Sequence, residues 1–161
     1  MRRILGSLCL ALALAGALIV PAVAGDQRPF AGQFDGAGIA VEQRCGPAAL
    51  TLGFAVTGEM THLGRLSGSG TNCTEFTLGT QAVPIYDGVV TLVAADGSTL
   101  TTTYEGRQDA PSAGVATFAH DHVITGGTRR FAGASGELSV SGVFDLVNFT
   151  VSGRVTGWIS Y

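Results

Sequence analysis

Two histidines, His120 and His122, are the residues of this chain whose type and spacing could most directly do chemistry. They stand two positions apart in an expected strand, so both would point to one face while Asp121 points to the other. Such a pair can supply two metal ligands, but zinc would need a third group, such as His62 or Glu59, from another strand. No sequence pattern brings that group to the pair. We therefore interpret it as a partly buried polar contact and assign no metal site.

Glu105 is the carboxylate whose environment depends most simply on strand alternation. Its side chain should lie on the same strand face as those of Thr101 and Thr103, and on the face opposite Thr102 and Tyr104. On an inner face its pKa would rise and it could act as a general acid or base, whereas on an outer face it would be solvated. We favour the outer face because threonine-rich strand faces normally meet water.

None of these groups is paired in sequence with a base or a nucleophile, so the catalytic residues stay unknown and no cofactor is assigned. The candidates kept for ligand binding are Glu59, His62, Glu105, His120 and His122.

Residues 126–136 combine clustered glycines with Arg129 and Arg130, a composition that could cradle a phosphate group. A cradle of that kind opens a helix, yet here strand alternation resumes at Leu138. The segment is therefore predicted to be a glycine-rich hairpin or a barrel corner.

The elements that must position these residues are strands, because the chain shows period-two alternation bounded by glycine and no sustained helical period. Asp96-Gly97 predicts a tight primed hairpin turn. Residues 77–86 contain Pro84 and no clean alternation, so they are expected to form a loop or an edge, and a break is expected near Gly58. The expected strands, about eight, are residues 32–41, 50–57, 65–74, 89–94, 98–105, 115–124, 137–146 and 148–161. This number and the short connections predict an all-β fold, a closed eight-stranded antiparallel up-and-down barrel, with a β-sandwich as the alternative.

The first 24 residues have the features of a signal peptide: Arg2 and Arg3, an uncharged apolar run, and the sequence Ala22-Val23-Ala24 at its end. We expect cleavage after Ala24, rather than a retained membrane anchor, leaving residues 25–161 as a single β-barrel domain that is secreted or periplasmic. In that oxidising location Cys45 and Cys73 are the two remaining cysteines and should form a disulfide.

The mature part carries seven arginines, no lysine and twelve acidic residues. Nucleic acid is therefore excluded as a partner, because its binding needs clustered positive charge, and no stable membrane insertion is expected after cleavage. The aromatic residues suffice either to line or to fill a small apolar cavity.

Residues 124–138, with the sequence Ile-Thr-Gly-Gly-Thr-Arg-Arg-Phe-Ala-Gly-Ala-Ser-Gly-Glu-Leu, resemble a segment of secreted barrel proteins related to allene oxide cyclase and dirigent proteins. The stretch Thr61-His62-Leu63-Gly64-Arg65 and the hairpin over residues 90–104 are similar to bacterial members of that group. The pattern differs at Arg129, where the family has glycine. The resemblance implies a calycin-like barrel with a ligand-sized interior, as a trimer or dimer, and it carries over no catalytic residue.

Taken together, these features predict a non-enzymatic exported barrel that binds a small apolar ligand or serves a structural or interaction role. An isomerase or cyclase resembling the plant enzymes is an alternative that requires Glu59, Glu105 or Asp121 to face a cavity. A metal-binding protein using His120 and His122 is a second alternative.

Overall fold

The structure is a computed structural model that describes residues 26–40, 44–46, 49–75, 82–109 and 112–161. The predicted signal peptide lies outside the described residues. Among the described residues, no helix has the length and apolar character needed to cross a membrane.

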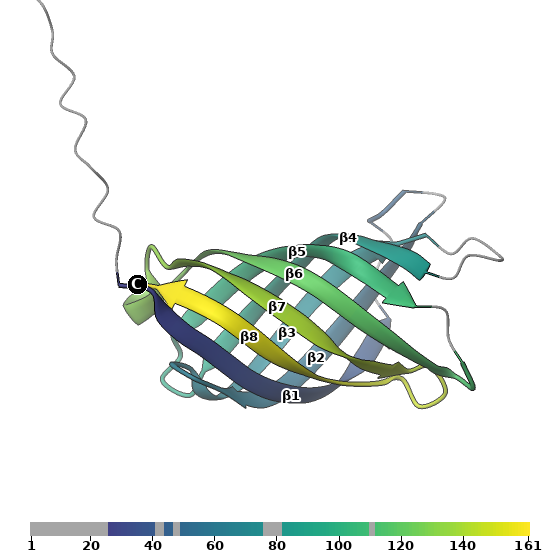
Figure 1. The fold of residues 1–161 in the computed structure, drawn as a ribbon, viewed down its shortest axis with the longest axis horizontal. Coiled ribbons are helices and arrows are strands. Elements are labelled where there is room, and N and C mark those ends of the chain that lie inside the picture. Colours follow the sequence, from purple (N-terminus) through teal and green to yellow (C-terminus); the bar gives the residue numbers. More distant parts are fainter. Residues whose placement is uncertain (1–25, 41–43, 47–48, 76–81, 110–111) are drawn as a thin grey trace, which may run out of the picture.

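The described chain forms a closed antiparallel barrel (Figure 1), as the sequence predicts. Its strands are β1 Arg28–Ala40, β2 Leu50–Met60, β3 Gly64–Thr74, β4 Ala82–Ala94, β5 Thr99–Asp109, β6 Val115–Gly127, β7 Ser135–Asp145 and β8 Thr150–Ser160. Each strand pairs with the next, and β1 pairs with β8, for example Gly32 with Val155. This last pairing closes the sheet and rules out the sandwich alternative.

Alternation along each strand puts apolar side chains inside and polar ones outside, as in β2, where Val56 is buried and Thr57 exposed. The predicted break at Gly58 is absent, because β2 stays paired with β3 through Met60. The continuous strands give the barrel one wall with an apolar inner surface.

Residues 82–86, expected to form a loop or an edge, belong to strand β4: residues 82–85 pair with β5, and Ile85 and Tyr86 pair with β3. The rest of that expectation, residues 77–81, lies outside the described residues. The register shifts between Ile85 and Gly88, where Asp87 has a φ of 50°. Buried positions therefore change from odd numbers, such as Val83, to even numbers, such as Val90. Because of this β-bulge, the sequence of the strand shows no single alternating pattern.

The hairpin between β4 and β5 lies where Asp96-Gly97 predicts it, but its loop has three residues rather than two. The amide of Gly97 donates to the carbonyl of Ala94 at 2.8 Å, and the amide of Ala94 donates to the carbonyl of Ser98 at 2.9 Å. Of the three loop residues only Gly97 has a positive φ, of 76°. One left-handed glycine after a turn is the usual form of a three-residue hairpin.

One end of the barrel is closed by η1, a short 3-10 helix of residues Arg129–Phe131 that joins β6 to β7. Phe131 is fully buried there, and its ring meets that of Tyr161 at 5.0 Å between centroids. β7 begins at Ser135, so residues 126–136 form the connection from β6 to β7, where the sequence predicts a glycine-rich hairpin or a barrel corner. Arg129 has a φ of 53°, the left-handed conformation that glycine favours, at the position where the resembling family has glycine.

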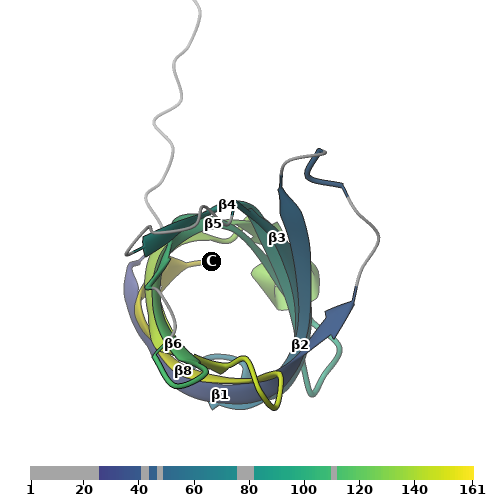
Figure 2. The same ribbon diagram turned by 90° about the vertical axis from the view of Figure 1, so that its right-hand side faces the viewer.

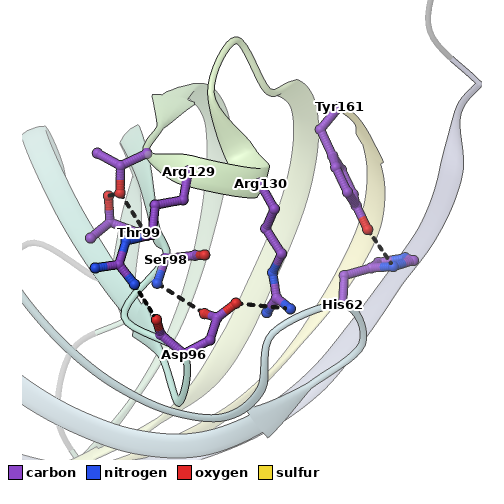
Figure 3. A network of polar contacts seen from close by, with 8 residues as sticks. His62, Asp96, Ser98, Thr99, Arg129, Arg130 and Tyr161 are labelled. Carbon is purple, nitrogen blue, oxygen red and sulfur yellow. Dashed lines mark hydrogen bonds and ion pairs between the residues drawn. The ribbon is translucent and has the colours of Figure 1, made fainter.

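Polar contacts hold the η1 segment onto the β4–β5 hairpin (Figure 3). The guanidinium of Arg129 donates to the carbonyl oxygen of Asp96, and that of Arg130 lies 3.3 Å from the Asp96 carboxylate. The amide of Ser98 donates to the same carboxylate at 2.9 Å. Both arginines thus hold this end of the barrel together.

The opposite end of the barrel carries the predicted disulfide between Cys45 and Cys73, whose Cα atoms lie 5.5 Å apart. It ties the chain between β1 and β2 to the end of β3. Disulfides persist in oxidising compartments, so this bond points to an extracytoplasmic location.

Removing the disulfide, by replacing Cys45 and Cys73 with alanine, should lower the free energy of unfolding by about 3 kcal/mol. The reason is that the bond closes a loop of 28 residues and restricts the unfolded chain. Urea denaturation measures the change, and reduction of the unaltered protein should reproduce it. A loss below about 1 kcal/mol in both experiments would contradict the prediction.

Candidate functional site

A cavity of about 660 Å³ occupies the barrel interior and is lined by all eight strands. Phe149 and Leu50 line it at the end opposite η1 and are 58% and 50% exposed, so this end is its mouth. Figure 2 looks into the barrel from the mouth, with η1 at the far end. The volume falls within the range of about 300–1,000 Å³ that is typical of small-molecule sites.

Most of the cavity surface is apolar. The apolar lining consists of Phe34, Leu50, Leu52, Phe54, Val56, Met60, Ile85, Val90, Leu92, Phe118, Leu138, Val140, Phe144, Leu146, Phe149, Val151 and Val155. Within the described chain, no aspartate, glutamate, lysine or arginine contributes to it. The cavity therefore offers a ligand a large apolar surface without a fixed charge.

Most polar side chains of the lining, Thr51 of β2 excepted, form one group, which we call the polar wall. It comprises Asn72 from β3, Thr102, Tyr104 and Gln108 from β5, and His120 and His122 from β6. Pairing of β5 with β6 places Tyr104 beside His122 and Gly106 beside His120. The strand register thus assembles the wall from residues far apart in sequence.

Hydrogen bonds fix part of the polar wall. Thr102 Oγ1 lies 2.9 Å from His122 Nδ1, and the Tyr104 hydroxyl donates to Asn72 Oδ1 at 3.1 Å. The Nε2 atoms of His120 and His122 are buried and have no hydrogen-bond partner among the described residues. The wall therefore retains hydrogen-bonding capacity that the described residues do not use.

Stacked rings give the wall its shape. The Tyr104 ring stacks on His122 at 4.4 Å and on His120 at 5.0 Å, and His120 stacks on Phe118 at 4.8 Å. A Cβ atom at Gly88 would lie 2.5 Å from the Tyr104 ring. The absence of a side chain at Gly88 thus lets Tyr104 lie across β4 and reach Asn72 on β3.

Both histidines of the wall are neutral at pH 7. Burial lowers the pKa of His120 to about 4, although the nearby Asp121 opposes the shift. Burial, followed by the neighbouring His120, lowers the pKa of His122 to about 3. Burial also raises the pKa of Tyr104 above its usual range. The wall is thus an array of uncharged hydrogen-bonding groups.

The structure divides the ligand-binding candidates from the sequence into two groups. His120 and His122 share the inner face and line the cavity, whereas Glu59 and Glu105 are exposed on the outer face, as strand parity dictates. His62 lies at the closed end, where its Nε2 is 2.9 Å from the Pro29 carbonyl oxygen and its Nδ1 is 3.3 Å from the Tyr161 hydroxyl (Figure 3). Glu59, His62 and Glu105 therefore do not join the two cavity histidines.

In the described chain, the residues named for the two alternatives do not come together at the cavity. Asp121 is exposed like Glu59 and Glu105, so none of the three carboxylates proposed for a cyclase faces the cavity. Within the part of the chain that the structure describes, no three histidine, cysteine, aspartate or glutamate residues gather as a metal site would require.

The polar wall includes three residues that were not among the ligand-binding candidates from the sequence: Asn72, Thr102 and Gln108. Strand alternation places Thr102 and Gln108 on the same strand face as Tyr104, and Asn72 on the same face as Leu66. This pattern could have identified all three as inward-facing residues. Their convergence depends on the register of β3, β4 and β5, which sequence does not state.

The fold and the cavity define the class of protein: a closed eight-stranded antiparallel barrel with an internal, largely apolar cavity open at one end. Comparison of the chain with protein-family models and with curated protein sequences finds no match.

Proposed function

We propose that this protein is an exported, non-enzymatic barrel that binds a small apolar molecule in its interior. The observation that carries the proposal is the cavity of about 660 Å³ with an apolar, uncharged lining. Preformed apolar cavities with a few converging polar groups are typical of small-molecule sites. The Cys45–Cys73 disulfide and the predicted signal peptide support a secreted or periplasmic location.

A relationship to the allene oxide cyclase and dirigent barrels is part of this proposal. The closed barrel and the left-handed backbone at Arg129 support it. The carboxylates of Glu59, Glu105 and Asp121 lie outside the cavity, so the resemblance supports a shared architecture rather than the cyclase chemistry.

Filling the cavity tests the proposal. Val140 is buried on the inner face of β7, whereas Val143 on the same strand is 41% exposed. Val140→Trp should weaken binding of N-phenyl-1-naphthylamine, an uncharged fluorescent probe, at least about tenfold, because the added ring occupies the space that the probe needs. Fluorescence titration measures the affinity.

Val143→Trp is the matched control and should bind the probe like the unaltered protein. Native mass spectrometry of residues 25–161 reports, in addition, any copurified molecule and the subunit number, expected from the resemblance to be three or two. If the probe does not bind, or if both variants bind it equally, the interior is not the binding site.

A further inference from the structure

Resting on the proposed binding function, we propose that the cavity selects an uncharged ligand carrying a hydroxyl group, which hydrogen-bonds to the Nε2 atoms of the polar wall. The apolar body of the ligand then lies against the rest of the lining, toward the mouth.

A ligand could supply the hydrogen bonds that two buried nitrogen atoms of the polar wall lack in the described chain. His122 is 7% exposed, and its Nε2, like that of His120, has no partner in the described chain. A buried polar atom without a hydrogen bond carries a free-energy penalty that a ligand group can remove. Both rings line the cavity, so a ligand in the cavity, with a small rotation of either ring to uncover its Nε2, would supply such a group.

The cavity is unfavourable to a charged ligand group. The described cavity lining contains no ionised side chain, and both histidines of the polar wall are neutral. An ionised ligand group at the wall would be desolvated without a counter-charge, which is unfavourable. The Arg44 side chain is exposed, and its Nη2 donates to the carbonyl oxygen of Asp87 at 2.6 Å. It is absent from the lining, so the interior favours uncharged ligands.

The histidine nitrogen atoms restrict the kind of polar group that a ligand can present to the wall. A neutral imidazole has one donor and one acceptor nitrogen. His122 Nδ1 is taken by Thr102 Oγ1, and this hydrogen bond can run in either direction, so Nε2 can be a donor or an acceptor. A hydroxyl group can pair with Nε2 in both cases, whereas a ketone or ether oxygen can pair only with a donor. A hydroxyl therefore suits the wall best.

Three fluorescent molecules with one ring system test the proposal at pH 7.5: pyrene, 1-pyrenemethanol and 1-pyrenecarboxylate. Their flat rings match the stacked rings of the wall. In the unaltered protein, the alcohol should bind at least about tenfold more tightly than the carboxylate, the difference expected when one of two head groups is buried as an unpaired charge. Fluorescence titration gives each dissociation constant.

The decisive variant combines Thr102→Val with His122→Phe, which keeps a ring against Tyr104 and removes both partners of one hydrogen bond. We compare the dissociation constant of pyrene divided by that of 1-pyrenemethanol. This ratio should fall about tenfold in the variant, because the hydroxyl group loses a hydrogen-bond partner. His120→Phe should lower the same ratio. Asp121→Asn, on the outer face of the same strand, is the control and should leave it unchanged.

The outcomes separate this proposal from the proposed function. If none of the three molecules binds, the binding function itself fails. If pyrene binds but the carboxylate binds as tightly as the alcohol, or the ratio is the same in the double variant, the cavity binds apolar molecules without recognising the hydroxyl. Pyrene binding by the double variant also shows that its barrel is folded.

Discussion

Replacing Phe131 by alanine is expected to lower the free energy of unfolding by about 3–5 kcal/mol, the range found when a fully buried phenylalanine is truncated. Phe131 is 0% exposed and is the buried residue of η1, the element that closes the barrel opposite the mouth. Its ring contacts Tyr161, and the guanidinium of Arg130 lies 4.8 Å from its centroid. Truncation would leave these groups around a void. Urea denaturation, with the midpoint and slope compared, measures the loss.

Phe149→Ala is the matched control, because Phe149 lies at the mouth and is 58% exposed. More than half of its surface already meets water, so its truncation should lower the free energy of unfolding by only about 1–2 kcal/mol, well below the loss expected for Phe131. Equal losses in the two variants would show that η1 does not close a packed end of the barrel.

Acidification from pH 7 to pH 5 is the second change with a large expected effect. The pKa of a histidine in the unfolded chain is about 6.5, and burial lowers it to about 4 for His120 and about 3 for His122 in the folded protein. Below pH 6.5 the unfolded state therefore binds more protons than the folded state. The free energy of unfolding decreases as the pH is lowered, until the pKa values of the folded protein are reached. Linkage gives a loss of about 2 kcal/mol for each histidine across this range.

Denaturation curves at pH 7 and pH 5 measure the effect in a range where most carboxylates remain ionised in both states. In the Thr102→Val and His122→Phe double variant, the pH-dependent loss should be about half as large, because the contribution of His122 is removed and that of His120 remains. A stability that is the same at pH 7 and pH 5 would contradict the burial of the two rings.

The architecture could be predicted from sequence because alternation is a local property. The inner and outer faces of β2 and β5, including the outward position of Glu105, follow from parity alone. β4 was only partly predicted, because the bulge at Asp87 reverses parity within the strand. The bulge is stabilised by the pairing of β4 with β3 and with β5. Nothing in the sequence of residues 82–86 indicates these partner strands.

The candidate site was predicted in part for the same reason. The shared face of His120 and His122 is a consequence of their spacing, whereas their neighbours depend on which strands pair and in which register. The contact between Tyr104 and Asn72 spans β4 and requires the missing side chain of Gly88. The sequence also left open whether the aromatic residues fill or line the interior. In the structure Phe131 closes one end and Phe54, Phe118 and Phe144 line the cavity.

The start of β1 and the end of β8 lie together at the closed end, where the guanidinium of Arg28 stacks 4.8 Å from the ring centroid of Tyr161 (Figure 1). A protein immobilised on a sensor chip through a tag after Tyr161 would therefore direct its mouth away from the solid support. Ligand exchange would then be free of steric hindrance from the support, and neighbouring molecules could be packed densely without blocking one another.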